Sequence, residues 1–324
     1  MIYLYGVGSD IRDRNSLQIR AKSKHINQAI MRKLADVAKD KGAHKRAKAY
    51  WNTHYCLDRI ITFNGRIYGP RCKNRFCTYC SGVRKAQLIN KYLPILKVWE
   101  DTHLVTLTIK SVRANFLVAK IKEVSKKFIV LKNTLYKRWQ RGVGIKPLGL
   151  KVLECNFNSN SGTYNPHLHL LVPNSTTAEI LTQEWLRIWP PDSADQSGQI
   201  FTRVKDTEDD LINIIKYGAK ITFEPGSQKI SKKGKSETIY IRALDNIYAA
   251  TMGIRLVDRF GFNCTIQKKQ PKVSGTLVDE FQIWNYDSTS MDWISGENGN
   301  SLVAYIPELS LINSLEHEVD ISLE

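Results

Sequence analysis

Two histidines one residue apart stand where the chain alternates between polar and apolar residues. In Pro166-His167-Leu168-His169-Leu170, residues two apart on a strand share a face, so both imidazoles point one way and the leucines the other. Such a pair could hold a divalent cation from one side. Because His-x-His also occurs on ordinary strands, the pair alone does not establish a metal site.

A carboxylate, Glu154, is expected beside this pair. Residues 148–157 (LGLKVLECNF) and 167–172 (HLHLLV) have the pattern of strands, and the turn-rich NSNSGTYNP between them predicts a hairpin centred near 160–162. The hairpin would bring Glu154 next to the histidines as a third ligand. Two imidazoles and one carboxylate leave positions for water and phosphate oxygens, as a Lewis-acid site requires. The alternative is that Glu154 faces outward from its strand.

A tyrosine with a nearby lysine follows downstream, in DDLINIIKYGAK (209–220). Tyr217 and Lys220 are spaced i, i+3 and so share one face of a helix. A tyrosine can attack phosphorus if a metal or cation helps it toward the phenolate. Lys220 could also neutralise charge on the phosphoryl oxygens. Tyr-Lys pairs are common on surface helices, so this pair carries weight only in combination.

Three cysteines stand within nine residues, as Cys72-x4-Cys77-x2-Cys80. The CxxC half is typical of a turn that offers two sulfurs to one tetrahedral zinc ion. Cys56, on the strand expected sixteen residues upstream, is the favoured fourth ligand, and His54 is the second choice. The alternative is a reduced CxxC or a redox pair.

The charge of the chain is unevenly distributed. All 48 Lys and Arg fall within residues 1–272, which carry +27, whereas residues 273–324 carry −10, and the whole chain carries +17. A body this basic attracts nucleic acid, because each neutralised phosphate releases counterions. The alternative is a solvated basic surface without a ligand. With no long apolar run and no secretory signal pattern, we expect a cytoplasmic protein without a membrane partner.

The elements that would position these residues follow from periodicity. Strands are expected at 102–110, 148–157, 167–172 and 199–204, and helices at 81–100, 113–141, 176–188, 207–221 and 242–251. This order predicts an α+β fold with a central antiparallel sheet covered by helices. Four segments are expected: a basic helical arm at 1–51, either DNA-contacting or flexible, a zinc-binding lobe with its following helix at 52–100, a catalytic domain at 101–265, and an acidic C-terminal segment at 266–324.

Taken together, the motifs CKNRFCTYC, LVTLTIK, NPHLHLLVP and KYGAK stand in the order and rough spacing found in plasmid rolling-circle replication initiators of the HUH endonuclease superfamily. The resemblance covers about residues 52–265 and includes RLVDRFG at 255–261. It implies a ferredoxin-like or RRM-like antiparallel sheet with the histidines on a middle strand. It also implies a nickase that acts on single-stranded DNA or an origin hairpin and leaves a free 3′-OH and a 5′-phosphotyrosine.

The resemblance also assigns roles to residues. His167 and His169 would hold Mn²⁺ or Mg²⁺, Tyr217 would attack, and Lys216 and Lys220 would assist at the phosphate. Related single-tyrosine initiators often carry a glutamate one turn before the tyrosine, where this chain has Asn213. An amide cannot act as a general base, so Asp210 is a candidate substitute.

Two other functions stay open from the sequence. A single-strand transposase of the same superfamily needs the same chemistry, and a non-catalytic zinc-containing DNA-binding regulator would explain the charge and the cysteines. A host helicase is a candidate partner of an initiator. The sequence leaves the oligomeric state open, a dimer included.

Overall fold

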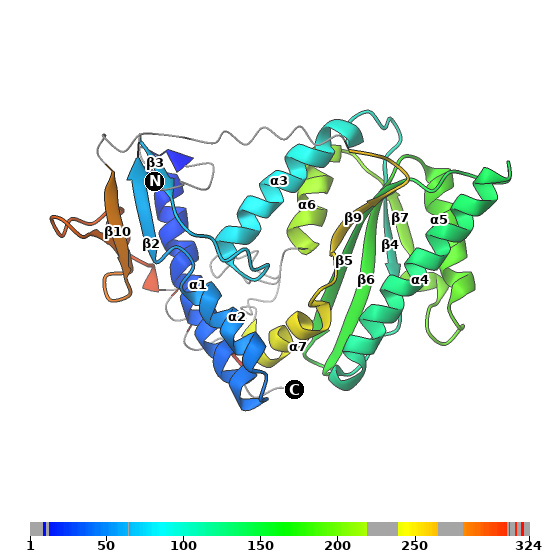
Figure 1. The fold of residues 1–324 in the computed structure, drawn as a ribbon. Coiled ribbons are helices and arrows are strands. Elements are labelled where there is room, and N and C mark those ends of the chain that lie inside the picture. The colour runs from blue at the N-terminus through cyan, green and yellow to red at the C-terminus, as the bar shows by residue number, and fades with distance from the viewer. Residues whose placement is uncertain are drawn as a thin grey trace. The chain divides into compact units, whose positions relative to one another are not determined.

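The computed structural model describes residues 9–10, 13–63, 65–218, 239–264, 281–309, 311, 315 and 319–320. These residues form helices and two antiparallel five-stranded sheets, which confirms the predicted α+β class (Figure 1). They divide into two compact units, each described here by itself. The first contains residues 13–83 and 281–309 together with three short strands at 9–10, 239–240 and 319–320, and the second contains 84–218 and 242–264. This division differs from the four segments expected from the sequence.

The first unit combines two helices with a sheet whose strands come from both ends of the chain. Its helices are α1 (Arg14–Asp40) and α2 (His44–His54), and the sheet order is β1-β3-β2-β10-β11. The strands are β1 (Ser9–Asp10), β2 (Arg59–Phe63), β3 (Arg66–Tyr68), β10 (Gln282–Asp287) and β11 (Asp292–Ser295). The short strands β8 (Ile239–Tyr240) and β12 (Val319–Asp320) pair in parallel. Strands β10 and β11 come from the expected acidic C-terminal segment, so part of that segment belongs to the five-stranded sheet.

Helix α1 is part of a folded core, which corrects the expectation of a flexible arm. Asp13 caps the helix by accepting a hydrogen bond from the Ser16 amide. Leu17 and Ala21 then pack into one core cluster with residues of the sheet and with the cysteines. Even Lys24 is only 4% exposed. Burial of this face fixes the helix in the first unit, while others of its basic residues stay exposed, namely Arg14, Arg32 and Lys39.

The second unit is built on an antiparallel sheet of order β7-β4-β6-β5-β9. Its strands are β4 (His103–Thr108), β5 (Gly149–Asn158), β6 (Thr163–Val172), β7 (Ile200–Arg203) and β9 (Val257–Phe260). β6 is the middle strand. The predicted hairpin forms between β5 and β6, with Gly162 at φ 63° in its turn.

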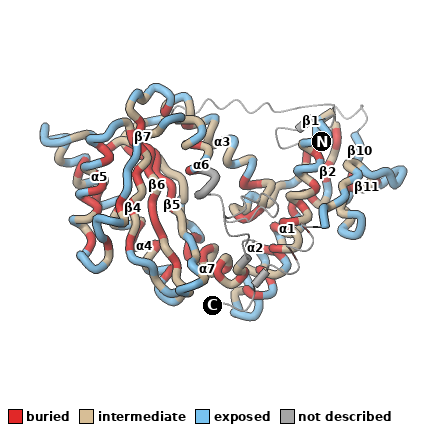
Figure 2. Tube along the Cα trace, turned by 180° about the vertical axis from the view of Figure 1, so that it is seen from behind, coloured by how far each residue is buried: buried red, intermediate tan, exposed pale blue. Residues whose placement is uncertain are grey.

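Helices cover both faces of this sheet (Figures 1 and 2). The helices are α3 (Thr78–Leu96), of which residues 84–96 belong to this unit, α4 (Ala114–Gln140), α5 (Ser175–Ile188), α6 (Thr207–Gly218) and α7 (Ile241–Thr251), with a short 3₁₀ turn at Gln196–Gly198. α4 and α5 pack against β6 and β4 on one face. On the other face, Tyr92 and Leu96 of α3 and Leu211 and Ile214 of α6 share a core cluster with β5 and β6.

The motif RLVDRFG contains β9 and ends in a glycine that the backbone requires. Gly261 has φ +78°, a conformation that side-chain-bearing residues rarely adopt. A Cβ on Gly261 would also lie 2.0 Å from the Pro147 carbonyl oxygen. The glycine thus lets the end of β9 pass close to the chain that enters β5.

The remaining predicted elements appear with small shifts at their ends, which is where helix and strand signals are weakest. α6, for example, is described only to Gly218, because residues 219–238, with the basic GSQKISKKGKSE segment, lie outside the described part. In the part of the chain that the structure describes, every helix is too short or too polar to cross a membrane.

Candidate functional site

The hairpin β5–β6 brings Glu154, His167 and His169 together. Glu154 pairs directly with His167 in the strand register, and Val152 pairs with His169. The Glu154 carboxylate oxygen Oε2 lies 3.6 Å from His167 Nε2 and 3.3 Å from His169 Nε2. A cation about 2.1 Å from each of three ligand atoms would hold them roughly 3.0–3.5 Å apart. The three atoms therefore have the spacing of a metal-binding group.

The other ring nitrogens of the two histidines are engaged by the protein. His167 Nδ1 lies 2.9 Å from the Asn165 carbonyl oxygen, and His169 Nδ1 lies 3.1 Å from the Thr106 hydroxyl oxygen. A carbonyl can only accept, so Nδ1 of His167 carries the proton and donates it. In the neutral imidazole this leaves a lone pair on Nε2, the atom that faces Glu154. Such outer partners orient histidines for metal binding.

The Glu154 carboxylate is charged and incompletely satisfied. Burial disfavours its ionisation, but the nearby His167 and His169 outweigh this effect and lower its pKa to about 2. Its Oε2 atom is buried and has no hydrogen-bond partner. Where an Nε2 atom carries a lone pair instead of a proton, as in the neutral tautomer of His167, it repels this anionic oxygen unless a cation lies between them. The donor set and the orphaned oxygen thus fit a divalent metal, and they exclude an outward-facing Glu154.

Helix α6 packs on the sheet face that carries this group. Val152 and Glu154 are two residues apart on β5, so their side chains lie on the same face of the sheet. Val152 packs in a buried cluster with Leu211 and Ile214 of α6. Tyr217 lies in the last turn of the helix, three residues after Ile214. The side chains of Lys216 and Tyr217, and the whole of Lys220, lie outside the described part of the chain.

Two further residues of α6 bear on the chemistry. Asn213, at the position of the expected glutamate, is exposed. Asp210 is half-buried, and burial together with the neighbouring carboxylates Asp206 and Asp209 raises its pKa. A carboxylate with a raised pKa is a better proton acceptor near neutral pH. Asp210 therefore keeps the chemical properties that a substitute for the missing glutamate would need.

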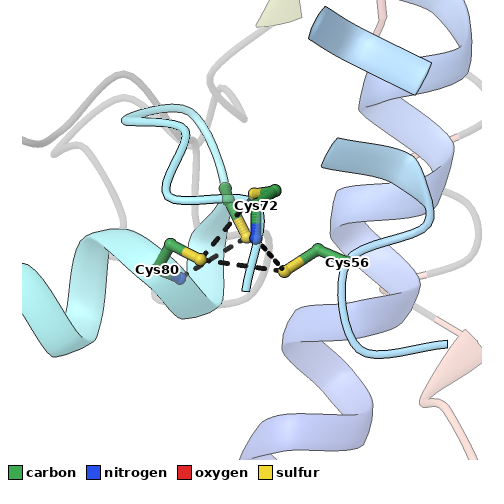
Figure 3. A group of neighbouring side chains, drawn as sticks. Cys56, Cys72 and Cys80 are labelled. Atoms are coloured by element: carbon green, nitrogen blue, oxygen red, sulfur yellow. Dashed lines mark hydrogen bonds between the residues drawn. The ribbon is translucent and has the colours of Figure 1, made fainter. Parts of the chain in front are cut away.

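The first unit holds a second candidate metal centre, formed by Cys56, Cys72, Cys77 and Cys80 (Figure 3). The sulfurs all lie within 4.8 Å of one another, and Cys80 Sγ lies 3.7 Å from both Cys56 Sγ and Cys72 Sγ. Four sulfurs at 2.3 Å from a tetrahedral zinc ion are about 3.8 Å apart. All four cysteines are free thiols. The spacing fits a four-sulfur metal site and leaves no place for a separate redox pair.

Backbone amides support these sulfurs. The amides of Cys72, Asn74 and Cys80 each point at a cysteine sulfur, 3.4 Å away. Hydrogen bonding with Cys56 raises the pKa of Cys77 and lowers that of Cys72. Four thiolates cannot share so small a space without a cation to offset their charge, so this arrangement is suited to a bound ion.

The fourth sulfur comes from a turn rather than from the expected strand. Cys56 follows α2 directly, and β2 begins only at Arg59. His54, the second choice, instead directs Nδ1 at the Gln28 carbonyl, 3.2 Å away. The structure thus brings Cys56, and not His54, to the other three cysteines.

Sequence reasoning missed the residues that hold the Cys56 turn. Lys24 donates to the His54 carbonyl (2.6 Å) and also pairs with Asp58, and so bridges both sides of Cys56. Trp293 donates its indole N–H to the Leu57 carbonyl at 2.7 Å. Leu57 has φ 63°, a strained conformation for its residue type. Burial lowers the pKa of Lys24, while Asp58 and the nearby cysteines favour its charged form.

Among curated proteins, the chain is similar to one named Protein rep from Staphylococcus aureus. The two are 32% identical over 146 residues, which is 42% of this chain and 62% of that protein. The chain thus spans less than two thirds of its relative's length. No family model and no solved structure matches the chain. The similarity supports a Rep-like protein.

Proposed function

We propose that this protein starts rolling-circle plasmid replication by cutting one strand of single-stranded or hairpin DNA at an origin. Tyr217 would form the covalent link to DNA. Glu154, His167 and His169 would hold Mn²⁺ or Mg²⁺ beside it. The observation that carries the proposal is the convergence of the Nε2 atoms of His167 and His169 on the buried, unpartnered carboxylate oxygen Oε2 of Glu154.

The position of α6 supports the choice of nucleophile. This helix packs on the sheet face of the Glu/His/His group through Leu211 and Ile214, and Tyr217 follows in its last turn. The bound cation would polarise the scissile phosphate. The phenol of Tyr217 would pass its proton to solvent water, and its oxygen would then form a bond to phosphorus. The bond from phosphorus to the 3′ oxygen breaks, and that oxygen takes up a proton to become the free 3′-OH.

Neighbouring residues have assisting roles in this proposal. Lys216 and Lys220 would offset charge on the phosphoryl oxygens during the transfer. Asp210 would accept the proton of a water or hydroxyl when a round is completed, in place of a glutamate at position 213. Asp210 lies in the first turn of α6, about 10 Å from Tyr217 along the helix axis at a rise of roughly 1.5 Å per residue. It would therefore act through an intervening water or DNA hydroxyl.

The four-cysteine cluster would bind zinc and stabilise the first unit. This structural role fits a closed set of four sulfurs, whereas the Glu/His/His group supplies only three ligands and would leave coordination positions for water or phosphate oxygens. If the protein were a non-catalytic zinc-containing regulator, the Glu/His/His group would have no function. A single-strand transposase would use the same chemistry on other DNA. The similarity to a protein named rep favours the initiator, and a host helicase would be its partner.

Covalent attachment to DNA tests the proposal. Purified protein and Mn²⁺ are mixed with a pool of random single-stranded 40-mers, with the label on the 3′ end in one sample and on the 5′ end in another. We expect a detergent-resistant adduct that carries only the 3′ label, because Tyr217 keeps the 5′ phosphate of the downstream fragment. The 5′-labelled fragment should be released with a free 3′-OH.

Matched variants identify the nucleophile. Tyr217→Phe should abolish the adduct, whereas Tyr136→Phe, which changes an exposed tyrosine of α4, should leave it unchanged. An adduct that persists in Tyr217→Phe would overturn the assignment of Tyr217. The absence of any adduct in metal-loaded protein would overturn the proposed function.

A further inference from the structure

One exposed face of α2 combines cations with aromatic rings. At about 100° per residue, the side chains at positions 45, 48, 51, 52 and 55 fall within an arc of roughly 120°. They are Lys45, Lys48, Trp51, Asn52 and Tyr55, and we call them the α2 stripe. All are exposed or half-buried, while Tyr50 and Thr53 on the opposite side are buried in the core. The burial of that opposite side fixes the stripe toward solvent.

The rings of the stripe are already arranged as a stack. The Trp51 and Tyr55 rings lie with centroids 5.9 Å apart and planes inclined by 24°. The edge of His54 contacts both rings, at centroid distances of 5.2 and 4.9 Å. Tyr55 is nevertheless 57% exposed. An aromatic ring held by its neighbours but largely open to solvent can receive a further flat ring at little cost in side-chain entropy.

Apart from its two histidines, the charged side chains of the segment that carries the α2 stripe are all positive. Residues 41–57 contain four Lys and Arg and no acidic residue. Within the described residues, Lys45 and Lys48 form no ion pair, so their charges are available to an anion. From Lys45 to Tyr55, the residue that caps the C-terminal end of α2, the stripe is about 15 Å long. This length matches several nucleotides, because successive phosphates of one strand lie about 3.4 Å apart along a B-form axis.

We propose that the α2 stripe is a binding site for single-stranded DNA, with phosphates on Lys45 and Lys48 and unpaired bases stacked on Trp51 and Tyr55. Stacked aromatics beside cations are how proteins hold single strands without reading their sequence. Paired bases hide their faces inside the duplex, so the rings favour unpaired DNA. The site belongs to the first unit and is separate from the Glu/His/His group; only the choice of DNA over RNA rests on the proposed function.

A binding assay without cleavage tests this site. Full-length Tyr217→Phe protein, in which the proposed cut cannot occur, is titrated against labelled dT15 without added divalent metal, and anisotropy is recorded. Replacing Tyr55 by Ala should weaken binding about 5-fold to 100-fold, the range found for loss of one stacked base. Tyr55→Phe keeps a ring and should bind nearly as well as the parent. The same Ala variant should bind a 15-base-pair duplex without change.

The cations have their own readout. For single strands, the slope of log K against log salt changes by about 0.7 per neutralised phosphate. Lys45→Ala with Lys48→Ala should therefore reduce this slope by about 1.4. Lys122→Ala with Lys126→Ala, on the exposed side of α4, is the matched control and should leave dT15 affinity within about twofold of the parent, because these two lysines are not part of the α2 stripe and surface charges are screened by salt.

Several results would overturn the inference. Unchanged dT15 affinity in Tyr55→Ala would remove the stacking site, and an equal loss for the duplex would show that the ring does not select unpaired bases. An equal loss with the α4 control would place the binding elsewhere, and equal affinity for rU15 would remove the commitment to DNA. Bound zinc, measured in each variant, should stay at one per chain. Covalent adduct formation is scored separately in the Tyr217 protein, so failure there would count against the proposed cut and not against the α2 stripe.

Discussion

The two candidate metal-binding groups of this chain differ in where their ligands come from and in how many ligands the protein supplies. The cysteine cluster draws four sulfurs from a turn, a loop and the start of α3, and amides surround them. The Glu/His/His group draws three ligands from two adjacent strands in one register and leaves a buried oxygen unsatisfied. A closed set suits a structural ion, while an incomplete set on a rigid sheet suits chemistry. The number of protein ligands, and the kind of backbone that carries them, distinguish a structural metal site from a catalytic one.

The largest effect is expected from removing one sulfur. Cys77→Ser should release zinc and unfold the first unit, because structural zinc contributes about 10–16 kcal/mol to the folding of small zinc domains. Cys264→Ser, a lone cysteine of the second unit, is the control and should keep its zinc. Metal content by mass spectrometry and thermal unfolding check both. Unchanged zinc content in Cys77→Ser would contradict the structural role of the cluster.

Removing the Glu154 carboxylate should weaken metal binding at the Glu/His/His group and leave the cysteine cluster unchanged. Glu154→Gln should weaken Mn²⁺ binding by at least about a hundredfold, since even losing a residue that only orients a ligand costs about 10–100-fold. Adduct formation should be lost while zinc content stays at one per chain. Calorimetric titration with Mn²⁺ measures the change. If Glu154→Gln bound Mn²⁺ as tightly as the parent, the site would lie elsewhere.

The hairpin β10–β11 should influence zinc through one indole. Trp293→Phe leaves the Leu57 carbonyl beside Cys56 without its donor, which should cost about 1–3 kcal/mol and speed zinc transfer to a chelator. Trp284→Phe is a matched control, because that indole donates to the Thr62 hydroxyl in the same sheet. Equal zinc release rates in the two variants would show that the Trp293 bond does not support the cluster.

The smallest effect concerns the orientation of His169. Thr106→Val removes the oxygen beside His169 Nδ1 and should weaken Mn²⁺ binding about tenfold, the lower end for such outer partners. Thr102→Val is the control, because the Thr102 hydroxyl, just before β4, donates to the Trp99 carbonyl rather than to a histidine or to a residue that orients one. Stopped-flow or calorimetric Mn²⁺ titrations compare the two. Equal losses would indicate a general disturbance of β4.

The two groups also differ in how far the sequence predicted them. The Glu/His/His group follows from local signals: a period of two and a turn at a known place put Glu154 opposite His167. The CxxC spacing likewise predicts Cys77 and Cys80 as a pair. The spacing also pointed to Cys56, but it could not show the turn on which this residue lies.

The features that could not be predicted from the sequence are contacts between segments far apart along the chain. Trp293 and Leu57 are 236 positions apart, and no local pattern connects them. The sequence did not predict the buried face of α1, because the polar residues Lys24 and Asn27 are buried there and interrupt the apolar periodicity of the helix. Local periodicity predicts elements and hairpins, whereas the support of the cysteine cluster depends on pairing between β2 and β10.

The division of labour between the two groups is tested most directly by a chelation and recovery experiment. Protein with one zinc per chain is treated briefly with a chelator that strips Mn²⁺ or Mg²⁺, and adduct formation and zinc content are measured before and after Mn²⁺ is returned. We expect adduct formation to vanish and recover while zinc stays at one per chain. Adduct formation that survives chelation, or that falls only in proportion to lost zinc, would contradict the account.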